Sequence, residues 1–266
     1  MFLGPSSLMD DVRMTDDTPP LKTVQRAFEI MEVLKEEKQV GVADLARRLD
    51  LPKSTAHDYL RTLRTMGYVV NDDGTYRLGF QLLELGGQVK YRNRLFHVAK
   101  PELERLVEKT GEQASVNVEE RGEFVILHTE FGSDSLQLGI YPGFRTPIHT
   151  HAGGKAILAH LGEESIERII ETHGLPAQTA NSITDPEELT VELEAVREQG
   201  YSIDRDEQVV GMGAVAAPVR VEDRVLGSVG IVCPSDRLLD DEQRDEFVRE
   251  VQKSANIVSV NYQYAP

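Results

Sequence analysis

Residues 51–79, LPKSTAHDYLRTLRTMGYVVNDDGTYRLG, decide the architecture of the first part of the chain. Proline favours the start of a helix, and the apolar spacing that follows predicts a helix over about 52–66 that stops at Gly67. Two β-rich runs then follow, at 68–70 and 75–78. The turn residues between them predict a β-hairpin with a four-residue connection.

Two further helices are predicted ahead of this stretch. Apolar residues recur at three- and four-residue spacing over about 23–35, which predicts an amphipathic helix. These apolar residues are Val24, Ala27, Phe28, Met31 and Leu34. A second helix is predicted over about 42–49. Three helices followed by a hairpin form a winged helix-turn-helix, so we expect residues 21–79 to be a DNA-binding domain.

The first 20 residues are polar, contain three prolines and follow no helical or strand period, which predicts a disordered tail over 1–20. Translation starts at either Met1 or Met14. No stretch approaches the ~18 apolar residues of a membrane span, and no basic segment precedes an apolar one as in a signal peptide. A lone cysteine, Cys233, cannot form an internal disulfide. We therefore expect a cytoplasmic protein without a membrane partner.

The charge balance is unusual for a protein that binds DNA. The 266-residue chain carries 45 Asp and Glu against 29 Lys and Arg, a net charge of −16. An acid-rich surface suits work at molar salt, where the Debye length is about 3 Å, so we hypothesise a halophilic source. Over 42–64 the bases nevertheless outnumber the acids. The bases there are Arg47, Arg48, Lys53, Arg61 and Arg64, and the acids are Asp44, Asp50 and Asp58.

The remainder of the chain follows a mixed pattern. A long helical pattern begins at Phe80, and we expect it to break near Gly86-Gly87 and again before Pro101, which makes 80–99 a linker helix. A capping box that begins at Thr184 is expected to open a later helix. Strands are expected at 114–118, 124–129, 136–140, 201–205, 215–219 and 225–232, and helices at 154–160, 164–172, 186–199 and 240–260. This order predicts an α+β domain over 100–266, an antiparallel sheet flanked by helices.

Five fragments, in their order and spacing, resemble the IclR family of bacterial and archaeal transcriptional regulators. They are residues 51–79, PIHTHAGGKAILAHL (147–161), SITDPEEL (182–189), REQGYSIDRDE (197–207) and AVAAPV (214–219). The resemblance runs from about Thr23 to the C-terminus. It implies a winged-helix DNA reader and a GAF-like effector domain. It also implies assembly as homodimers or tetramers on palindromic promoter sites.

If the third helix enters the major groove, its exposed side carries suitable side chains. Hydroxyl groups and helix N-terminal amides bind phosphate, and arginine can hold a guanine edge. We expect DNA contacts from Arg26, Arg47, Lys53, Ser54, Thr55, His57, Asp58, Arg61 and Arg77. The alternative is that the arginines form an ordinary solvated face. The linker helix, whose apolar side holds Leu83 and Val89, is expected to pair with a second subunit, the alternative being packing on its own domain.

Backbone amides at a helix N-terminus favour anions, and a glycine-rich segment precedes the helix expected at 154–160. The resemblance implies an effector pocket lined by Ala152, Gly153, Gly154, Asp204, Ala214, Gly230 and Val232. Relatives that bind small organic acids carry a polar or thiol group at the Ala214 position and serines at the last two positions. This sequence lacks those groups. An organic acid larger or less polar than a keto acid, such as an aromatic acid or a sugar acid, is therefore favoured.

The residues offer three alternatives to this function. His149, His151, Asp204 and Cys233 are plausible metal ligands, since His-x-His on a strand puts both rings on one face. Simpler roles are a structural cap for His149 and a buried apolar role for Cys233. An enzyme with Cys233 as nucleophile is disfavoured, because no paired carboxylates, nucleophile elbow or phosphate loop accompany it; no cofactor is expected. An architectural DNA protein without a ligand is the remaining alternative.

Overall fold

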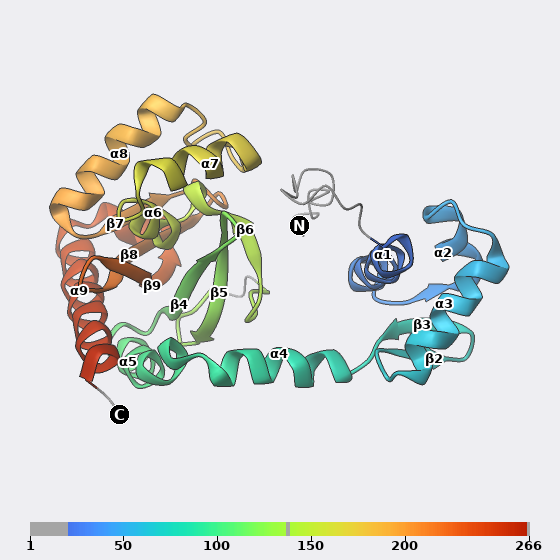
Figure 1. Ribbon diagram of the computed structural model, residues 1–266. Coiled ribbons are helices and arrows are strands. Elements are labelled where there is room, and N and C mark those ends of the chain that lie inside the picture. The colour runs from blue at the N-terminus through green and yellow to red at the C-terminus, as the bar shows by residue number, and fades with distance from the viewer. Residues whose placement is uncertain (1–20, 137–138, 265–266) are drawn as a thin grey trace. The chain divides into compact units, whose positions relative to one another are not determined.

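The computed structural model describes residues 21–136 and 139–264, so the tail predicted over 1–20 lies outside the described residues. The chain divides into two compact units after Val89 (Figure 1). None of the helices in the described part of the chain is long and apolar enough to cross a membrane. The domain limits predicted from the sequence stay a prediction.

The first unit is a winged helix-turn-helix, as predicted. Its elements are α1 (Lys22–Glu37), β1 (Val40–Gly41), α2 (Val42–Arg48), α3 (Lys53–Thr65), β2 (Val69–Asp72) and β3 (Thr75–Leu78). The three helices pack around Ile30, Leu45 and Leu60, which are fully buried. A small antiparallel sheet in the order β1-β3-β2 completes the unit.

The hairpin between β2 and β3 is tighter than predicted. The connection has two residues, Asp73 and Gly74, in place of the expected four, and both have positive φ, 49° and 91°. A two-residue turn of this kind matches the twist of the strands, and glycine tolerates the left-handed backbone. The strand β1 was not predicted, because two residues are too short to show a pattern.

The buried side of α1 differs from the prediction. Val24 and Phe28, which the apolar spacing assigned to the buried side, are 50% and 55% exposed. Ile30 and Val33 are buried instead, together with Leu34. The helix carries two apolar stripes, and the sequence pattern alone could not select the one that packs on α2 and α3.

The breaks predicted in the long helical region were also misplaced. α4 (Gln81–Arg92) runs through Gly86-Gly87, and α5 (Arg94–Thr110) runs through Pro101. The helix breaks at Asn93, whose side-chain oxygen accepts a hydrogen bond from the Leu95 N–H at 2.9 Å and so caps α5. Four buried residues of α5, Leu95, Ala99, Leu103 and Leu106, pack on the sheet and hold the proline-containing segment helical.

The second unit is an antiparallel sheet flanked by helices, which confirms the α+β prediction. Its strands are β4 (Gln113–Glu120), β5 (Glu123–Glu130), β6 (Arg145–Pro147), β7 (Ser202–Arg205), β8 (Met212–Val221) and β9 (Arg224–Pro234). Its other helices are η1 (Ile148–Thr150), α6 (Ala152–Leu158), α7 (Glu163–His173), α8 (Pro186–Gln199), η2 (Ser235–Leu239) and α9 (Asp241–Tyr264). The strand order is β6-β5-β4-β9-β8-β7.

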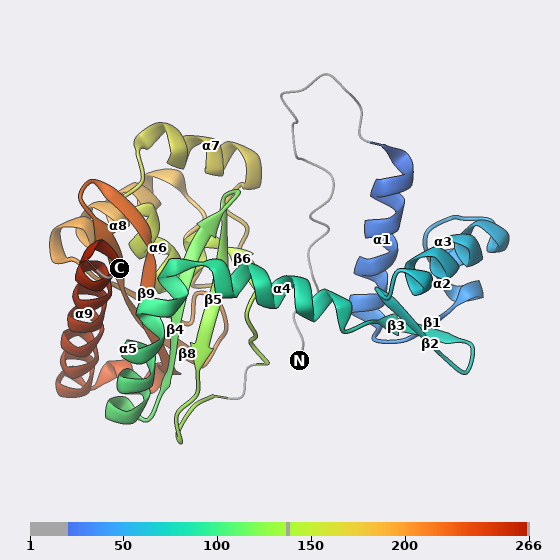
Figure 2. The same cartoon turned by 60° about the horizontal axis from the view of Figure 1, so that its bottom comes forward.

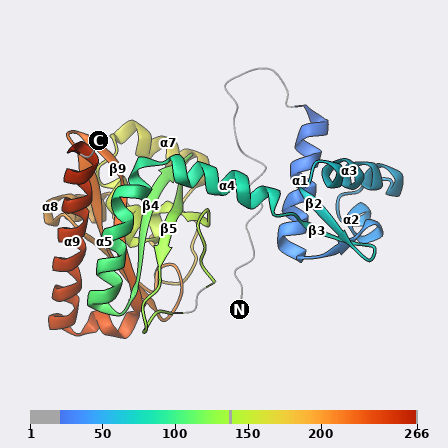
Figure 3. The ribbon, with the colours of Figure 1, turned by 90° about the horizontal axis from the view of Figure 1, so that it is seen from below.

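The two faces of this sheet are covered by different helices. α5 and α9 lie side by side against one face (Figures 2 and 3), where they bury Val215, Val229 and Ile231. Because side chains alternate along a strand, the neighbouring Ala214 and Val232 face the other way and pack with α6. The short helix α6 therefore lies directly on the second face of the sheet.

Two local predictions in this unit were wrong. The strand expected at 136–140 does not form: Leu136, Gly139 and Ile140 are outside any strand, and 137–138 lie outside the described residues. β6 pairs with the edge of β5 instead. The cap of α8 is Asp185 rather than Thr184, because the Asp185 carboxylate accepts the N–H groups of Glu187 and Glu188 at 2.9 and 3.0 Å.

Candidate functional site

The exposed side of α3 is a continuous polar stripe. Ala56, Leu60 and Leu63 turn inward at helical spacing, which fixes the opposite side of the helix in solvent. That side carries Lys53, Ser54, His57, Asp58 and Arg61, all exposed, with Thr55 half-buried beside them. Six of the nine residues predicted to contact DNA are thus gathered on one helix surface.

The remaining predicted contacts are held by acidic neighbours. Arg26 pairs with Glu29 at 2.6 Å and donates a hydrogen bond to the Leu49 carbonyl at 3.4 Å, which ties α1 to α2. Arg77 pairs with Asp72 at 2.6 Å inside the hairpin.

Two further arginines form exposed ion pairs, Arg47 with Asp44 at 2.7 Å and Arg61 with Asp58 at 3.1 Å. Exposed pairs of this kind contribute about 1 kcal/mol or less, so a phosphate can displace the carboxylate.

The charge of the chain is divided unevenly between its parts. Residues 21–79 carry ten Lys and Arg against nine Asp and Glu, a net charge of +1, whereas residues 80–266 carry −14. The acidic surplus therefore lies mostly outside the winged helix. The net charge of the whole chain does not oppose DNA binding by this unit, since screening limits charge effects to about a Debye length.

The second candidate site lies on the α6 face of the large sheet. Asp204 of β7 is paired with Ala214 of β8, and Ala214 with Val232 of β9, so three residues predicted to line a pocket form one row across the strands. Gly230 of β9 pairs with Ala216 of β8, two residues along each strand from the Ala214–Val232 pair. The sheet register therefore brings together residues that are up to 28 positions apart in the chain.

The glycines at the start of α6 allow the helix to lie close to its neighbours. A Cβ atom at Gly154 would stand 1.8 Å from the Ile148 carbonyl oxygen, and one at Gly153 would stand 2.8 Å from Phe124 and Ser228. The first backbone bond of α6 joins the Lys155 N–H to the His151 carbonyl at 2.9 Å. The amides of Ala152, Gly153 and Gly154 thus precede the hydrogen-bond ladder, as predicted for the start of a helix.

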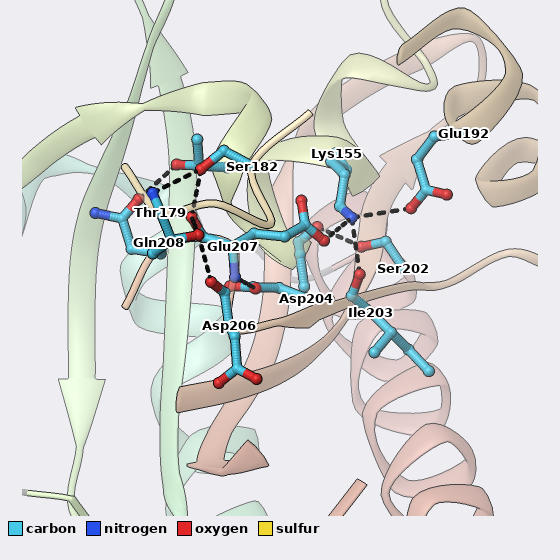
Figure 4. A network of polar contacts seen from close by, with 12 residues as sticks. Lys155, Thr179, Ser182, Glu192, Ser202, Ile203, Asp204, Asp206, Glu207 and Gln208 are labelled. Atoms are coloured by element: carbon cyan, nitrogen blue, oxygen red, sulfur yellow. Dashed lines mark hydrogen bonds and ion pairs between the residues drawn. The ribbon is translucent and has the colours of Figure 1, made fainter. Parts of the chain in front are cut away.

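The buried side chain of Lys155 links several elements on the α6 side of the sheet (Figure 4). The Lys155 side chain is 1% exposed, and its Nζ donates to Glu207 at 2.6 Å, to the Ile203 carbonyl at 2.8 Å and to Glu192 at 2.9 Å. Burial by itself would lower the pKa of Lys155, but the carboxylates of Glu207 and Glu192 outweigh it and raise the pKa. Lys155 is therefore a fixed positive charge that links α6, α8 and the loop after β7.

Glu207 is the centre of this network. Its carbonyl oxygen accepts hydrogen bonds from Thr179 and Ser182, and its N–H donates to the Asp204 carboxylate at 2.9 Å (Figure 4). Burial, and then the charge of Glu207, raise the pKa of Asp204 to about 7. The second carboxylate oxygen of Asp204 is buried and has no hydrogen-bond partner. The protein therefore fixes one oxygen of the Asp204 carboxyl group, and the other receives no hydrogen bond from the described residues.

The residues of the metal alternative do not assemble. Cys233 packs on the α5 and α9 side of the sheet, away from α6, and burial raises the pKa of its thiol to about 12. His151 stacks on Phe124 with ring centroids 4.4 Å apart, and burial lowers its pKa to about 4. Within residues 21–136 and 139–264, no group of three or more His, Cys, Asp or Glu could hold a metal ion. His149 hydrogen-bonds the backbone of Pro176.

Several buried polar residues of the second unit were not predicted, Lys155 and Gln113 among them. Lys155 stands in a run of small apolar residues, and Gln113 begins β4, where both of its amide atoms are buried without a partner. The pairing of Gln113 with Val232 extends the row of Asp204, Ala214 and Val232 by one strand. A lysine among small apolar residues is a sequence signal for Lys155, whereas Gln113 follows Glu112 in a polar stretch and its place comes from the strand register alone.

These features define a class of protein. A winged helix with an exposed polar stripe, on the same chain as a separate sheet unit that holds a buried polar site, is typical of a DNA-binding regulator with a sensor domain.

Comparison with known proteins gives the family. The family model for the IclR helix-turn-helix domain matches residues 23–73, and the model for the bacterial transcriptional regulator IclR C-terminal domain matches residues 88–260. The chain belongs to the IclR family of transcriptional regulators, and it is a regulator rather than an enzyme. Its N-terminal unit is the DNA-binding domain, and its C-terminal unit is the effector domain.

Three relatives illustrate the similarity. The chain is 33% identical to the Probable HTH-type transcriptional regulator ArcR of Halobacterium salinarum, over 92% of this chain and 95% of that protein. It is 29% identical to the regulator KdgR of Escherichia coli, over 92% and 94% of the two chains. The crystal structure of an IclR homologue from Microbacterium hydrocarbonoxydans, complexed with 4-hydroxybenzoate, is 25% identical with a TM-score of 0.79, covering 92% of this chain and all of that one.

Proposed function

We propose that this regulator binds a palindromic promoter site as a cytoplasmic homodimer or tetramer, and that an organic acid in the C-terminal unit changes its affinity for that site. The proposed DNA binding rests on the exposed stripe of α3, where Lys53, Ser54, His57 and Arg61 lie outside the apolar core. Serine and lysine at the start of the helix suit phosphate oxygens. Arg61, two turns further on, suits a guanine edge.

Exposed apolar side chains support assembly into a homo-oligomer. Leu21, just before α1, and Val24 and Phe28 on α1 are between 50% and 75% exposed and follow helical spacing. On α4, which has no buried residue in this chain, Leu83 and Val89 are 70% and 73% exposed. Apolar stripes of this kind mark surfaces that a partner covers. A second copy of the chain would bury them and bring two α3 helices to the two halves of a palindrome.

The apolar lining of the second site supports an organic acid as effector. Ala214 and Val232 of the sheet pack with Ala152 and Ala156 of α6, so the surroundings of Asp204 on this face are apolar. This lining suits an aromatic acid or a sugar acid better than a two- or three-carbon keto acid. A homologue of similar fold is complexed with 4-hydroxybenzoate. Binding at this site is expected to change operator affinity by a coupling free energy of about 1–3 kcal/mol, or about 5- to 150-fold.

The test is fluorescence anisotropy of the full chain on labelled DNA from just upstream of its own gene, at high KCl, with scrambled DNA for comparison. Arg61→Ala is expected to weaken operator binding by about 5- to 150-fold, because a bidentate arginine contact contributes about 1–3 kcal/mol. Arg168→Ala, which removes an exposed arginine on α7, is the matched control and is expected to bind like the wild type. Equal operator binding by the Arg61 and Arg168 variants would contradict α3 as the reader.

A further inference from the structure

A cleft of about 310 Å³ lies between α7 and the turn that joins β4 to β5. One wall is the turn, with Arg121 and Gly122, and the other wall is one side of α7. None of the residues predicted to line the effector pocket lines this cleft. Sites for small molecules have volumes of about 300–1,000 Å³, so the cleft is large enough for a small metabolite.

The side of α7 that lines the cleft differs in charge from the rest of the helix. Ser165, Arg168, Ile169 and Thr172 line the cleft, and their spacing of three and four residues places them on one side of the helix. The helix also carries four glutamates, and none of them lines the cleft. The cleft therefore receives an arginine and two hydroxyl groups from α7, and no carboxylate.

Arg121, on the opposite wall, stands where the backbone does not favour an arginine. Arg121 and Gly122 form the two-residue turn between β4 and β5, with φ of 59° and 83°. Turns of this kind favour Asn, Asp or Gly at the first position. The same position in the hairpin of the first unit is Asp73, with φ of 49°. The geometry of the turn therefore does not explain Arg121, and a side chain kept in such a conformation often has a functional role.

The carboxylates closest to Arg121 in sequence are engaged elsewhere. Arg145 pairs with both Glu120 and Glu123, the acids on either side of the turn. Glu119, which lines the cleft, accepts a hydrogen bond from the N–H of the turn glycine at 2.7 Å. Among the described residues, Arg121 forms no ion pair. Its positive charge is therefore available to a ligand.

The two walls of the cleft are fixed to each other. His173 of α7 donates a hydrogen bond from Nε2 to the Arg121 carbonyl oxygen at 2.7 Å. A Cβ atom at Gly122 would stand 2.6 Å from the His173 ring, so the turn lies directly against the helix. Arg168 donates to the Ser165 hydroxyl at 3.1 Å and forms no ion pair within residues 21–136 and 139–264. Two arginines therefore line the cleft from opposite walls.

This set of donors suits a phosphate group. Arginine binds phosphate oxygens through paired, charge-assisted hydrogen bonds, and the hydroxyls of Ser165 and Thr172 can each donate one more. A phosphate monoester has a second pKa of about 6, so it carries about two negative charges at pH 8, whereas a carboxylate carries one. Leu161 and Ile169 add apolar surface to the lining. This surface suits an organic group attached to the phosphate.

We propose that the cleft between α7 and the β4–β5 turn binds a small phosphate monoester, with its phosphate held by Arg121 and Arg168 and its organic group against Ile169. The site is separate from the effector pocket, so the proposal goes beyond the proposed function and gives the C-terminal unit a second ligand. Neither arginine belongs to the winged helix, so operator binding measured without a phosphate ester does not depend on this site.

The test is isothermal titration calorimetry of the full chain at pH 8 and high KCl with butyl phosphate, inorganic phosphate and pentanoate. Pentanoate carries a carboxylate on the same alkyl chain as butyl phosphate. The wild type is expected to bind butyl phosphate roughly tenfold or more tightly than pentanoate, because the dianion can engage both arginines. Inorganic phosphate is expected to bind severalfold more weakly than butyl phosphate, because it lacks the apolar group.

Two variants locate the site. Arg121→Asn and Arg168→Gln are each expected to weaken binding of butyl phosphate and inorganic phosphate by roughly tenfold. Arg121→Asn is also expected to melt at or above the temperature of the wild type, because asparagine tolerates the left-handed backbone, so its loss of binding cannot come from unfolding. Arg249→Asn, at an exposed position on α9, is the matched control and is expected to bind like the wild type.

Three results would overturn the proposal. The wild type could fail to bind butyl phosphate, or it could bind pentanoate as tightly, which would exclude a phosphate site. Binding of butyl phosphate with wild-type affinity by both Arg121→Asn and Arg168→Gln would place the ligand outside this cleft.

Discussion

Replacing Lys155 by methionine isolates the contribution of a buried charge network. The Lys155 side chain is 1% exposed and that of Glu207 is 11% exposed, so loss of the lysine leaves a carboxylate buried without its cation. Removal of one partner from a buried ion pair costs about 3–5 kcal/mol. For a unit of this size each kcal/mol lowers the melting temperature by about 2–4 °C, so the C-terminal unit is expected to melt about 6–20 °C earlier.

The measurement is differential scanning calorimetry with far-UV circular dichroism, since the chain has no tryptophan for fluorescence. Lys100→Met is the matched control, because the Lys100–Glu104 pair is 46% and 50% exposed and contributes about 1 kcal/mol or less. The loss in Lys155→Met is expected to persist at molar salt, which screens buried pairs weakly. Combining it with Glu207→Gln is expected to recover much of the lost stability.

Two results would refute this reasoning. One is a free energy of unfolding of Lys155→Met within about 1 kcal/mol of that of the wild type, because a buried carboxylate that has lost its cation destabilises the fold by more than this. The other is a double variant no more stable than Lys155→Met alone. That result would mean that the lysine acts through its packing and not through its charge.

Three other predictions address pH, packing and assembly. The pKa of Asp204 is raised to about 7, so the stability it contributes is present at pH 4 and lost as the pH rises through 7. Relative to Asp204→Asn, the wild type should lose up to about 4 kcal/mol between pH 4 and pH 8, measured by denaturation with circular dichroism; a constant difference would disprove the shift. Gly154→Ala should destabilise the chain by about 1–3 kcal/mol or more, because the new Cβ meets the Ile148 carbonyl oxygen. Gly86→Ala, which has open space around it, should stabilise the chain by about 0.5–1 kcal/mol. Equal melting temperatures of the two variants would contradict this prediction. Leu83→Glu should shift the sedimentation equilibrium toward monomer, and an unchanged mass would exclude α4 from the interface.

Elements with strong local signals could be predicted from the sequence. The helix α3 and the two strands after it follow from the apolar spacing, the proline before the helix and the glycine after it. The α+β class of the second unit follows from the alternation of β-rich runs and helical periods. These signals depend on residues close together in the chain, so they are visible without the fold.

Predictions failed where distant residues decide the outcome. Gly86-Gly87 and Pro101 locally favour helix breaks, yet α4 and α5 run through them, and for α5 the buried residues on the sheet outweigh the proline. Phe28 has the spacing of a core residue and is exposed, because α1 packs through Ile30 and Val33 instead. A residue's own neighbours in sequence do not reveal which of two apolar stripes meets another helix.

The sequence by itself determined a winged helix followed by an α+β domain, and it placed six of nine expected DNA contacts on one helix, because helical periodicity sorts inner from outer positions. It also suggested Asp204, Ala214 and Val232 through family resemblance. Only the tertiary structure decided that Gln113 completes their row and that Cys233 faces the opposite side, because strand pairing joins residues more than 100 positions apart. The register of paired strands fixes which side chains are neighbours on one face of the sheet, and no run of adjacent residues carries that information.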